Sequence, residues 1–408
     1  MNRKTLLIKY CTLQGLFWAI CCVSSGSINT YLYEIGVGTG TIGLLSGLAG
    51  ITATLIQPVL GGIADRNPAK RGWRFMLQAF SVLLLASYII LKLTSNHMIS
   101  GILMALTFMS VYAMFPFING ITFYYEREGI VLDYGTSRGI GSICSAGTSY
   151  LIGAGVTAFG VSVITTTGII LTLVFVAITF TFPVLKSDVA KTDVSEENSS
   201  PAEASGETIE TAQKTESTIA FFRQYPEFAA ILFGFICVFC CQMLGSGYNL
   251  QICERLGGGT TEMGIVQAIA SMVELPIMFS FSAIIKRVPS YKLLKIASVA
   301  FLLKALCLLM ANSIYIVYAA QLIQMFSYGL FTMAAVYYAN EIVTGSNKLK
   351  GQALLGSATS IGGPAGNFLG GMLIQYFGLT FDLAVAVVLG IIGVTSVFMA
   401  GKLKKKHA

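Results

Sequence analysis

CCVSSGSINTYLYEIGVGTGTIG, residues 21–43, and CCQMLGSGYNLQICERLGGGTTEMG, residues 240–264, are two versions of one pattern. The polar residues of the two stretches match in register, which is harder to obtain by chance than a match between apolar residues. The matches within these stretches and beyond them are Gly26-Ser27 with Gly245-Ser246, Asn29 with Asn249, Glu34 with Glu254, Pro58 with Pro276, and Arg138-Gly139 with Lys350-Gly351. The chain is therefore predicted to consist of two related halves.

The composition places both halves in a membrane. Hydrophobic residues make up 55% of the 408 residues and charged residues 11%, with a mean hydropathy of +0.74; a soluble domain has about 25% charged residues. A helix that spans a bilayer needs about 20 mostly apolar residues. We therefore expect an all-α integral membrane protein whose twelve helices cover residues 8–33, 40–64, 74–94, 98–124, 138–159, 162–185, 228–252, 262–285, 292–311, 313–341, 351–377 and 379–401.

The positive charges predict the orientation in the bilayer. When loops are assigned to alternate sides, nearly all Lys and Arg residues fall on one side, and only Lys92 and Arg255 fall on the other. The positive-inside rule then places both termini in the cytoplasm of a multi-pass protein of the inner (plasma) membrane. The net charge of +7 reflects this topology, and no nucleic-acid partner is expected.

The stretch 186–218 is acidic, rich in Ser and Thr and without aromatic residues. Such a segment cannot bury a core, so we expect a disordered cytoplasmic linker. It separates an N-terminal six-helix half, residues 1–185, from a C-terminal half, residues 219–408, and residues 219–228 form an amphipathic lead-in at the membrane interface. Both halves start on the same side, so the repeats are parallel, and a solute would bind between them near the midplane.

The sequence contains few features that would indicate an enzyme. There are two His residues, and the nine Cys residues show no metal-binding spacing, so neither a metal nor a cofactor is expected. The Gly38–Gly43 stretch matches GxGxxG, but it joins two membrane helices and lacks the strand that a dinucleotide site requires. We expect a protein that is not an enzyme.

Charges inside the predicted helices mark a functional site. Glu274 and Lys304 each lie in mid-helix, where a charge is costly unless it is paired or faces a polar cavity. The alternative is a buried ion pair that only orients two helices. In either case both side chains should face the interior of the bundle.

The loop after the second predicted helix, GGIADRNPAKR at residues 61–71, resembles the helix 2–3 signature of the major facilitator superfamily. The resemblance covers the whole chain and implies the twelve-helix major facilitator fold. It also implies a gating latch formed by Asp65, Arg66 and Arg71. Pro68 departs from the signature, which usually has Gly at this position.

The stretch LDYGTSRG at residues 132–139 is similar to the start of helix 5 in the lactose permease and oligosaccharide–proton symporter group. The resemblance implies that Arg138 and Glu274 bind solute, and it aligns Lys304 with an Arg of that group. An interfacial positive-inside Arg is the alternative for Arg138. Gln324 and Ser327 replace a His and a Glu, Ser145 replaces a Trp, and no carboxylate lies near Asn119. These departures put lactose-type coupling and a galactoside substrate in doubt.

We therefore expect a monomeric secondary active transporter that moves a small polar solute by alternating access in symport with a proton. The solute could be a sugar or oligosaccharide, a nucleoside or an organic acid. Glu274 and Lys304 are the candidates for proton coupling. The candidate substrate-binding residues are Arg138, Glu274, Asn29, Asn119, Asn249, Gln324 and Tyr328. An exporter of drug-like or metabolite cargo and a non-transporting solute sensor are the alternatives.

Overall fold

The computed structural model describes residues 3–66, 72–126, 129–130, 132–182, 218–343 and 348–407. Within these ranges the regular structure is helical, which confirms the predicted fold class. The helices are α1 Arg3–Ser24, α2 Ile28–Glu34, α3 Thr39–Arg66, α5 Trp73–Leu93, α6 His97–Glu126, α7 Tyr134–Phe159, α8 Ser162–Phe180, α10 Thr218–Gln224, α11 Pro226–Ser246, α12 Asn249–Arg255, α13 Thr260–Ile284, α14 Ser290–Met310, α15 Ile314–Leu322, the 3₁₀ turn η1 Ile323–Met325, α16 Tyr328–Ile342, α17 Lys348–Phe377 and α18 Leu379–His407.

Three of the predicted continuous spans are broken. The first span divides into α1 and α2 at residues 25–27, and the seventh divides into α11 and α12 at residues 247–248. The first break contains Gly26-Ser27, and the second follows directly after the matching Gly245-Ser246, at Gly247; glycine is suited to positions where the chain leaves a helix. A Cβ on Gly26 would lie 2.7 Å from the carbonyl oxygen of Cys22, so this turn requires glycine. The tenth span is interrupted by η1 between α15 and α16.

Within the described ranges, ten spans are long and apolar enough to cross a membrane. The two remaining predicted spans correspond to α7 and α17, which are rich in Gly, Ser and Thr. Small and hydroxylated residues are typical of helix surfaces that pack closely against other helices in a membrane. The low hydropathy of α7 and α17 thus fits their positions, since each packs against a helix of the other half.

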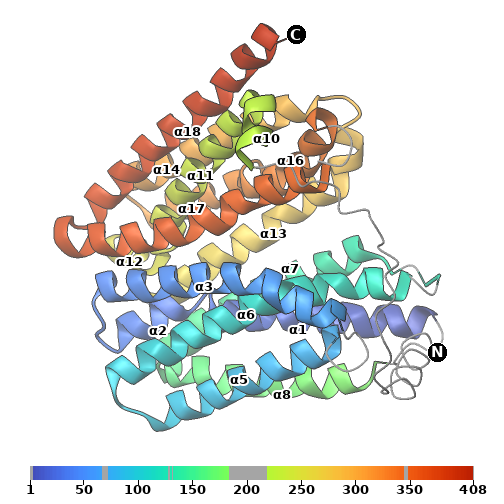
Figure 1. Ribbon diagram of the computed structural model, residues 1–408. Coiled ribbons are helices and arrows are strands. Elements are labelled where there is room, and N and C mark those ends of the chain that lie inside the picture. Colours follow the sequence, from blue (N-terminus) through green and yellow to red (C-terminus); the bar gives the residue numbers. More distant parts are fainter. Residues whose placement is uncertain are drawn as a thin grey trace.

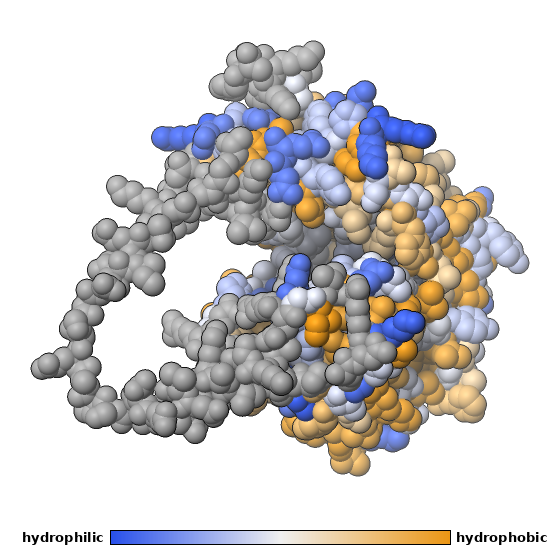
Figure 2. Space-filling view, turned by 90° about the vertical axis from the view of Figure 1, so that its right-hand side faces the viewer, coloured by the Kyte–Doolittle hydropathy of each residue, from blue (hydrophilic) through white to orange (hydrophobic). Residues whose placement is uncertain are grey.

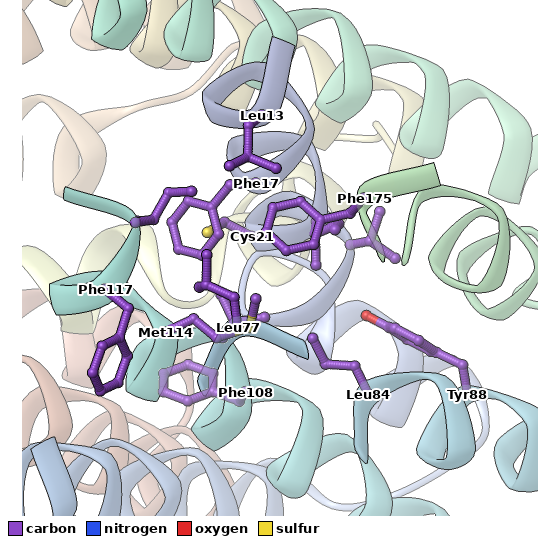
Figure 3. Close-up of a cluster of buried hydrophobic side chains, with 14 of the residues drawn as sticks. Leu13, Phe17, Cys21, Leu77, Leu84, Tyr88, Phe108, Met114, Phe117 and Phe175 are labelled. Carbon is purple, nitrogen blue, oxygen red and sulfur yellow. The ribbon is translucent and has the colours of Figure 1, made fainter. Parts of the chain in front are cut away.

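The helices form two bodies stacked one above the other (Figure 1), with α1 to α8 in the lower body and α10 to α18 in the upper one. Each body has its own hydrophobic core: one draws on residues between Leu6 and Phe182, the other on residues between Phe221 and Ala400. In the lower core, side chains of α1, α5, α6 and α8 converge around Phe17 and Cys21 (Figure 3). Tyr88 is fully buried there, and its hydroxyl lies 2.6 Å from Ser24 Oγ.

The segment 219–228, which we expected to be an amphipathic lead-in, packs onto the upper core. Phe221 and Phe228 are fully buried, and their rings meet edge to face with centroids 5.3 Å apart. The predicted linker before it, up to residue 217, lies outside the described residues.

The two bodies meet through two equivalent pairs of helices, α3 with α17 and α7 with α13. A Cβ on Gly43 would lie 2.9 Å from the Cα of Gly371, and a Cβ on Gly153 would lie 2.9 Å from the Cα of Gly264. Gly43 and Gly264 are the last residues of the two matching stretches, so the two crossings are copies of one another. Only glycine permits such close contact between helix backbones.

Both crossings lie toward the same end of the molecule. We call this the loop end, because α2, α12 and the starts of α3 and α13 lie there; the terminal end is the opposite one, where α1 begins and α18 finishes (Figure 1). At the terminal end of α3, a Cβ on Gly61 or Gly62 would meet nothing within 4 Å. Figure 2, which looks onto the terminal end, shows a hollow between the two bodies. The halves are therefore joined at the loop end and separated beside the terminal end of α3, whereas α7 and α13 stay in contact as far as Gly139 and Phe279.

Candidate functional site

A polar cavity of about 260 Å³ lies between the two halves. It collects side chains from α1 and α7 of the lower body and from α11 to α16 of the upper body. Six of the predicted residues line it together: Arg138, Asn249, Glu274, Lys304, Gln324 and Tyr328. The two mid-helix charges thus face the interior of the bundle, as the sequence predicted.

The lining on α7 and α13 follows helical spacing. Arg138 is followed on α7 by Ser142, Ser145 and Ser149, at intervals of three and four residues that keep one face of a helix toward the cavity. On α13 the spacing of Gln267, Ser271 and Glu274 does the same. Across the cavity, the hydroxyls of Ser145 and Ser271 lie 3.2 Å apart.

Glu274 and Lys304 are connected through an amide and not by direct contact. Lys304 Nζ donates to Gln324 Oε1 at 2.7 Å, and Gln324 Nε2 donates to Glu274 Oε1 at 3.2 Å. Gln324 sits in η1, so the break in the tenth span brings the amide between the two charges. Glu274 and Lys304 are 7% and 2% exposed. This relay Lys304–Gln324–Glu274 is hereafter called the charge relay.

Two further polar groups hold the charge relay in place. Ser246 Oγ accepts from Lys304 Nζ at 3.3 Å and from Gln242 Nε2 at 3.0 Å. Gln242 Nε2 also lies 3.3 Å from Gln324 Oε1. A buried charge needs such a shell, because an unsatisfied charge in a membrane interior is costly.

Arg138 stands on the other wall of the cavity. Its guanidinium carbon lies 3.8 Å from the centroid of the Trp18 ring, and its Nη1 donates to Ser142 Oγ at 2.6 Å. Stacking on an indole holds the guanidinium plane in one orientation. The sequence placed Ser145 where the resembled group has a Trp, and here α1 of the same half supplies an indole, Trp18.

A second cavity of about 230 Å³ adjoins the first and shares Ser246, Asn249 and Gln267 with it. Asn29 lines this second cavity and donates from Nδ2 to the carbonyl oxygen of Gly247, in the break between α11 and α12. The matched pair Asn29 and Asn249 therefore meets in space. The side-chain carbonyl oxygens of both residues are buried without a hydrogen-bond donor.

Some predicted site residues lie elsewhere or outside the described side chains. Asn119 is not part of either cavity lining, and its Oδ1 accepts from the Tyr134 hydroxyl at 3.4 Å. The backbone of Asp65 and Arg66 ends α3, but their side chains and the whole of Arg71 fall outside what the structure describes. The gating role of these three residues stays a prediction.

Sequence reasoning missed several lining residues. Ser142, Ser149, Gln267 and Ser271 were not among the candidates, although each lies at helical spacing from another charged or polar residue of its helix. Steps of three or four residues from Arg138 along α7 and from Glu274 along α13 would have identified all four residues. Among the described residues, no group of three or more His, Cys, Asp and Glu could hold a metal.

Two stacked bodies of six membrane spans, joined at one end around a polar cavity, define a membrane transporter of the major facilitator type. The chain belongs to the MFS_1-like family, whose model matches residues 8–383. The family match and the fold confirm the prediction of a major facilitator transporter. None of the curated proteins matches the sequence.

Solved transporter structures share the fold across the chain. The nucleoside transporter NupG superposes with a TM-score of 0.73 at 16% identity, covering 99% of this chain and 100% of that one. A D-xylose–proton symporter gives 0.66 at 13% identity, covering 97% of each chain. A POT family transporter in complex with 5-aminolevulinic acid gives 0.70 at 12% identity, covering 98% and 96%. At these identities the likeness establishes the architecture alone.

Proposed function

We propose that this protein is a secondary active transporter that moves a small polar solute by alternating access, in symport with a proton. The observation that carries the proposal is the polar cavity between the halves, with three charged side chains in the membrane interior. Charges in that position are costly and are retained where they serve a solute or ion pathway. The similar structures named for nucleoside and xylose–proton transport carry solutes of this polar kind.

The conformation supports alternating access. The halves are joined at the loop end by the two glycine crossings and are separated beside the terminal end of α3. With both termini in the cytoplasm of the plasma membrane, as the positive-inside rule indicates, this is an inward-facing state. Rocking of the two bodies about the cavity would open the loop end to the outside.

Glu274 is our candidate for the proton carrier. It is a buried carboxylate that Gln324 links to Lys304, so its protonation would remove the negative end of the charge relay. Lys304 would then be free to change partners, which would couple proton binding to the packing of α13 against α14 and η1. Asp65, Arg66 and Arg71 are proposed to latch the terminal end in the alternate state.

The polar lining favours an importer of hydrophilic solutes over an exporter of drug-like cargo. Outside Trp18, Ala270 and Tyr328, the lining consists of charged, amide, hydroxyl and thiol side chains. The volume of about 260 Å³ lies just below the range of about 300–1,000 Å³ that drug-sized ligands occupy. A monosaccharide, a nucleoside or a small organic acid suits this space better than an oligosaccharide. We propose that the transporter acts as a monomer.

The test is uptake into proteoliposomes that contain the purified protein. Sugars, nucleosides and organic acids would be screened, first by counterflow and then under an inward proton gradient. We expect saturable counterflow for at least one solute and accumulation driven by the proton gradient. Glu274→Gln should abolish accumulation while retaining counterflow, since exchange of bound solute needs no net proton movement.

Two results would overturn the proposal. Full gradient-driven accumulation by Glu274→Gln would exclude Glu274 as the coupling group. Solutes that bind the purified protein without any counterflow would indicate a sensor in place of a transporter.

A further inference from the structure

The cavity between the halves carries an uneven set of charges. The charged side chains of its lining are Arg138, Lys304 and Glu274, two cations and one carboxylate. With all three in their ordinary charge states, the empty cavity holds one net positive charge. A net charge enclosed between two halves of a membrane protein is costly, so the closed cavity favours a ligand that cancels it.

Arg138 makes no hydrogen bond to a charged group, whereas Lys304 and Glu274 share the amide of Gln324. Lys304 is bound to Gln324 and Ser246, and through Gln324 it is linked to Glu274. Glu274 lies within electrostatic reach of both cations, with Arg138 acting on it more strongly than Lys304, and its hydrogen bond comes from Gln324, the amide that binds Lys304. The partners of Arg138 are the Ser142 hydroxyl and the Trp18 ring, which carry no charge.

Arg138 is also arranged to bind a planar anion. A guanidinium has five N–H donors, and one of its nitrogens, Nη1, donates to Ser142. The Trp18 ring covers one of its faces and fixes its plane, so the remaining donors on its edge can present a fork. Such a fork matches the two oxygens of a carboxylate.

The second cavity carries no charged side chain and has unpaired acceptors. Asn249 is 7% exposed and lines both cavities, and its Oδ1 has no donor; Asn29 Oδ1 in the second cavity has none either. Buried acceptors without a donor are costly, so these two oxygens are suited to donors supplied by a ligand. The Trp18 indole N–H, beside Arg138, is likewise buried without an acceptor.

We propose that the solute is a sugar acid: a hydroxylated monocarboxylate of about monosaccharide size. Its carboxylate binds the guanidinium of Arg138, and its hydroxyls donate to the side-chain oxygens of Asn29 and Asn249. The carboxylate cancels the charge that the coupled proton adds when it binds Glu274, so the loaded cavity holds no more charge than the empty one when the halves rock. The inference rests on the proposed function, because it names the solute of the same site.

The test is equilibrium binding to the purified protein. The chain has two tryptophans, Trp18 and Trp73, so a Trp73→Phe background leaves Trp18, beneath Arg138, as the only indole. Four probes separate charge from hydroxyls: glucuronate, glucose, glucosamine and hexanoate. Binding would be followed by Trp18 fluorescence and, independently, by thermal unfolding. We expect glucuronate to bind at least about tenfold more tightly than glucose or hexanoate, and glucosamine to bind most weakly.

Substitutions of Arg138 and Asn249 test which side chains cause the preference for glucuronate. Arg138→Gln should remove the advantage of glucuronate over glucose, and Arg138→Lys should keep part of it, which separates loss of charge from loss of folding. Asn249→Ala should reduce the advantage of glucuronate over hexanoate and leave the advantage over glucosamine. Lys92→Gln is the matched control, because this lysine binds Thr166 at the surface of the lower body, away from the cavity.

Three results would overturn the inference: glucose binding as tightly as glucuronate, an acid preference that persists in Arg138→Gln, or no acid that changes either signal. Two further results would distinguish a failure of the proposed function from a failure of this inference. If glucuronate binds through Arg138 but shows no counterflow, the anion site stands and transport does not. If a neutral solute is transported by wild type and Arg138→Gln alike, transport stands and the sugar-acid inference does not.

Discussion

The two halves of the molecule share their backbone plan and differ in the chemistry they bring to the cavity. The first span of each half breaks at the same Gly-Ser stretch, and the two glycine crossings are copies of each other. The lower half then contributes a single cation, Arg138, held on an indole. The upper half contributes the charge relay, with Gln324 positioned by the extra break at η1.

The shared and the differing features of the halves serve two different tasks, closing the bodies on each other and holding charge in the cavity. The features that the halves share are those that let the bodies close on each other at the loop end. The features that differ are those that hold charge inside the membrane. The shared features thus form the gate, and the differences in α7, α13, α14 and η1 form the site.

The largest expected effect is on the two glycine crossings, Gly43 with Gly371 and Gly153 with Gly264, hereafter called the symmetric gate. Gly371→Leu on α17 and Gly153→Leu on α7 each drive a side chain into a backbone, toward Thr39 and Gly43 in one case and Thr260 and Gly264 in the other. Overpacking that raises the free energy of the inward-facing state by ~3 kcal/mol would lower the population of that state by about a hundredfold. Transport would fall with it. The measurements are counterflow and the reaction of Cys22, which lines the cavity, with an impermeant thiol reagent added outside.

The control uses glycines of the same two helices with free space around them. A Cβ on Gly363 of α17 or on Gly147 of α7 would meet nothing within 4 Å, so Gly363→Ala and Gly147→Ala should transport normally. Because the crossings are copies, the two Leu variants should behave alike. A defect in one variant with normal transport in the other would refute the symmetric gate.

The second prediction concerns the charge relay, which has no counterpart in the lower half. Lys304→Met and Glu274→Gln should each destabilise the protein, because each leaves part of the relay buried without its partner. The double variant should lose less than the sum, with a coupling of about 1–2 kcal/mol. Thermal unfolding in detergent of the four proteins forms the double-mutant cycle.

Lys92→Met is the control for removing a lysine from a membrane helix, since Lys92 is exposed near one end of α5 and bonds Thr166. Its effect should add to that of Glu274→Gln without coupling. Additive losses for Lys304→Met and Glu274→Gln as well would show that Gln324 does not connect the two charges energetically.

Patterns in the sequence predicted the spans, the repeat and the inward-facing charges, because these depend on residue type at fixed spacing. The broken helices were not predicted: a Gly-Ser stretch inside an apolar run is compatible with a continuous helix, and the break depends on packing between helices. The stacking of Trp18 on Arg138 joins residues about 120 positions apart, and no local pattern encodes such a contact. Asn119 was placed by analogy with related positions, and the turn of α6 that carries it lies away from the cavity.

The smallest expected effect compares the starts of the two helices that cross at Gly153 and Gly264. Asp133 caps α7 by accepting from the backbone N–H of Thr136 at 3.2 Å, whereas in α13 Glu262 accepts from the backbone N–H of Gly259 at 2.7 Å. Asp133→Ala should lower stability by about 1 kcal/mol, as for other N-cap residues. Asp133→Asn, which keeps an acceptor, should lose less.

The pH dependence distinguishes the carboxylate from a neutral cap. Hydrogen bonds from the Thr136 side chain and backbone hold the pKa of Asp133 below its ordinary value of 3.8. A carboxyl with a lowered pKa in the folded protein stabilises it above the ordinary value, and this contribution is lost as the pH falls through the lowered one. The difference in melting temperature between wild type and Asp133→Asn should therefore be constant near pH 7 and shrink below about pH 4. A difference that is independent of pH down to pH 3 would mean that the Asp133 cap acts through its shape and not through its charge.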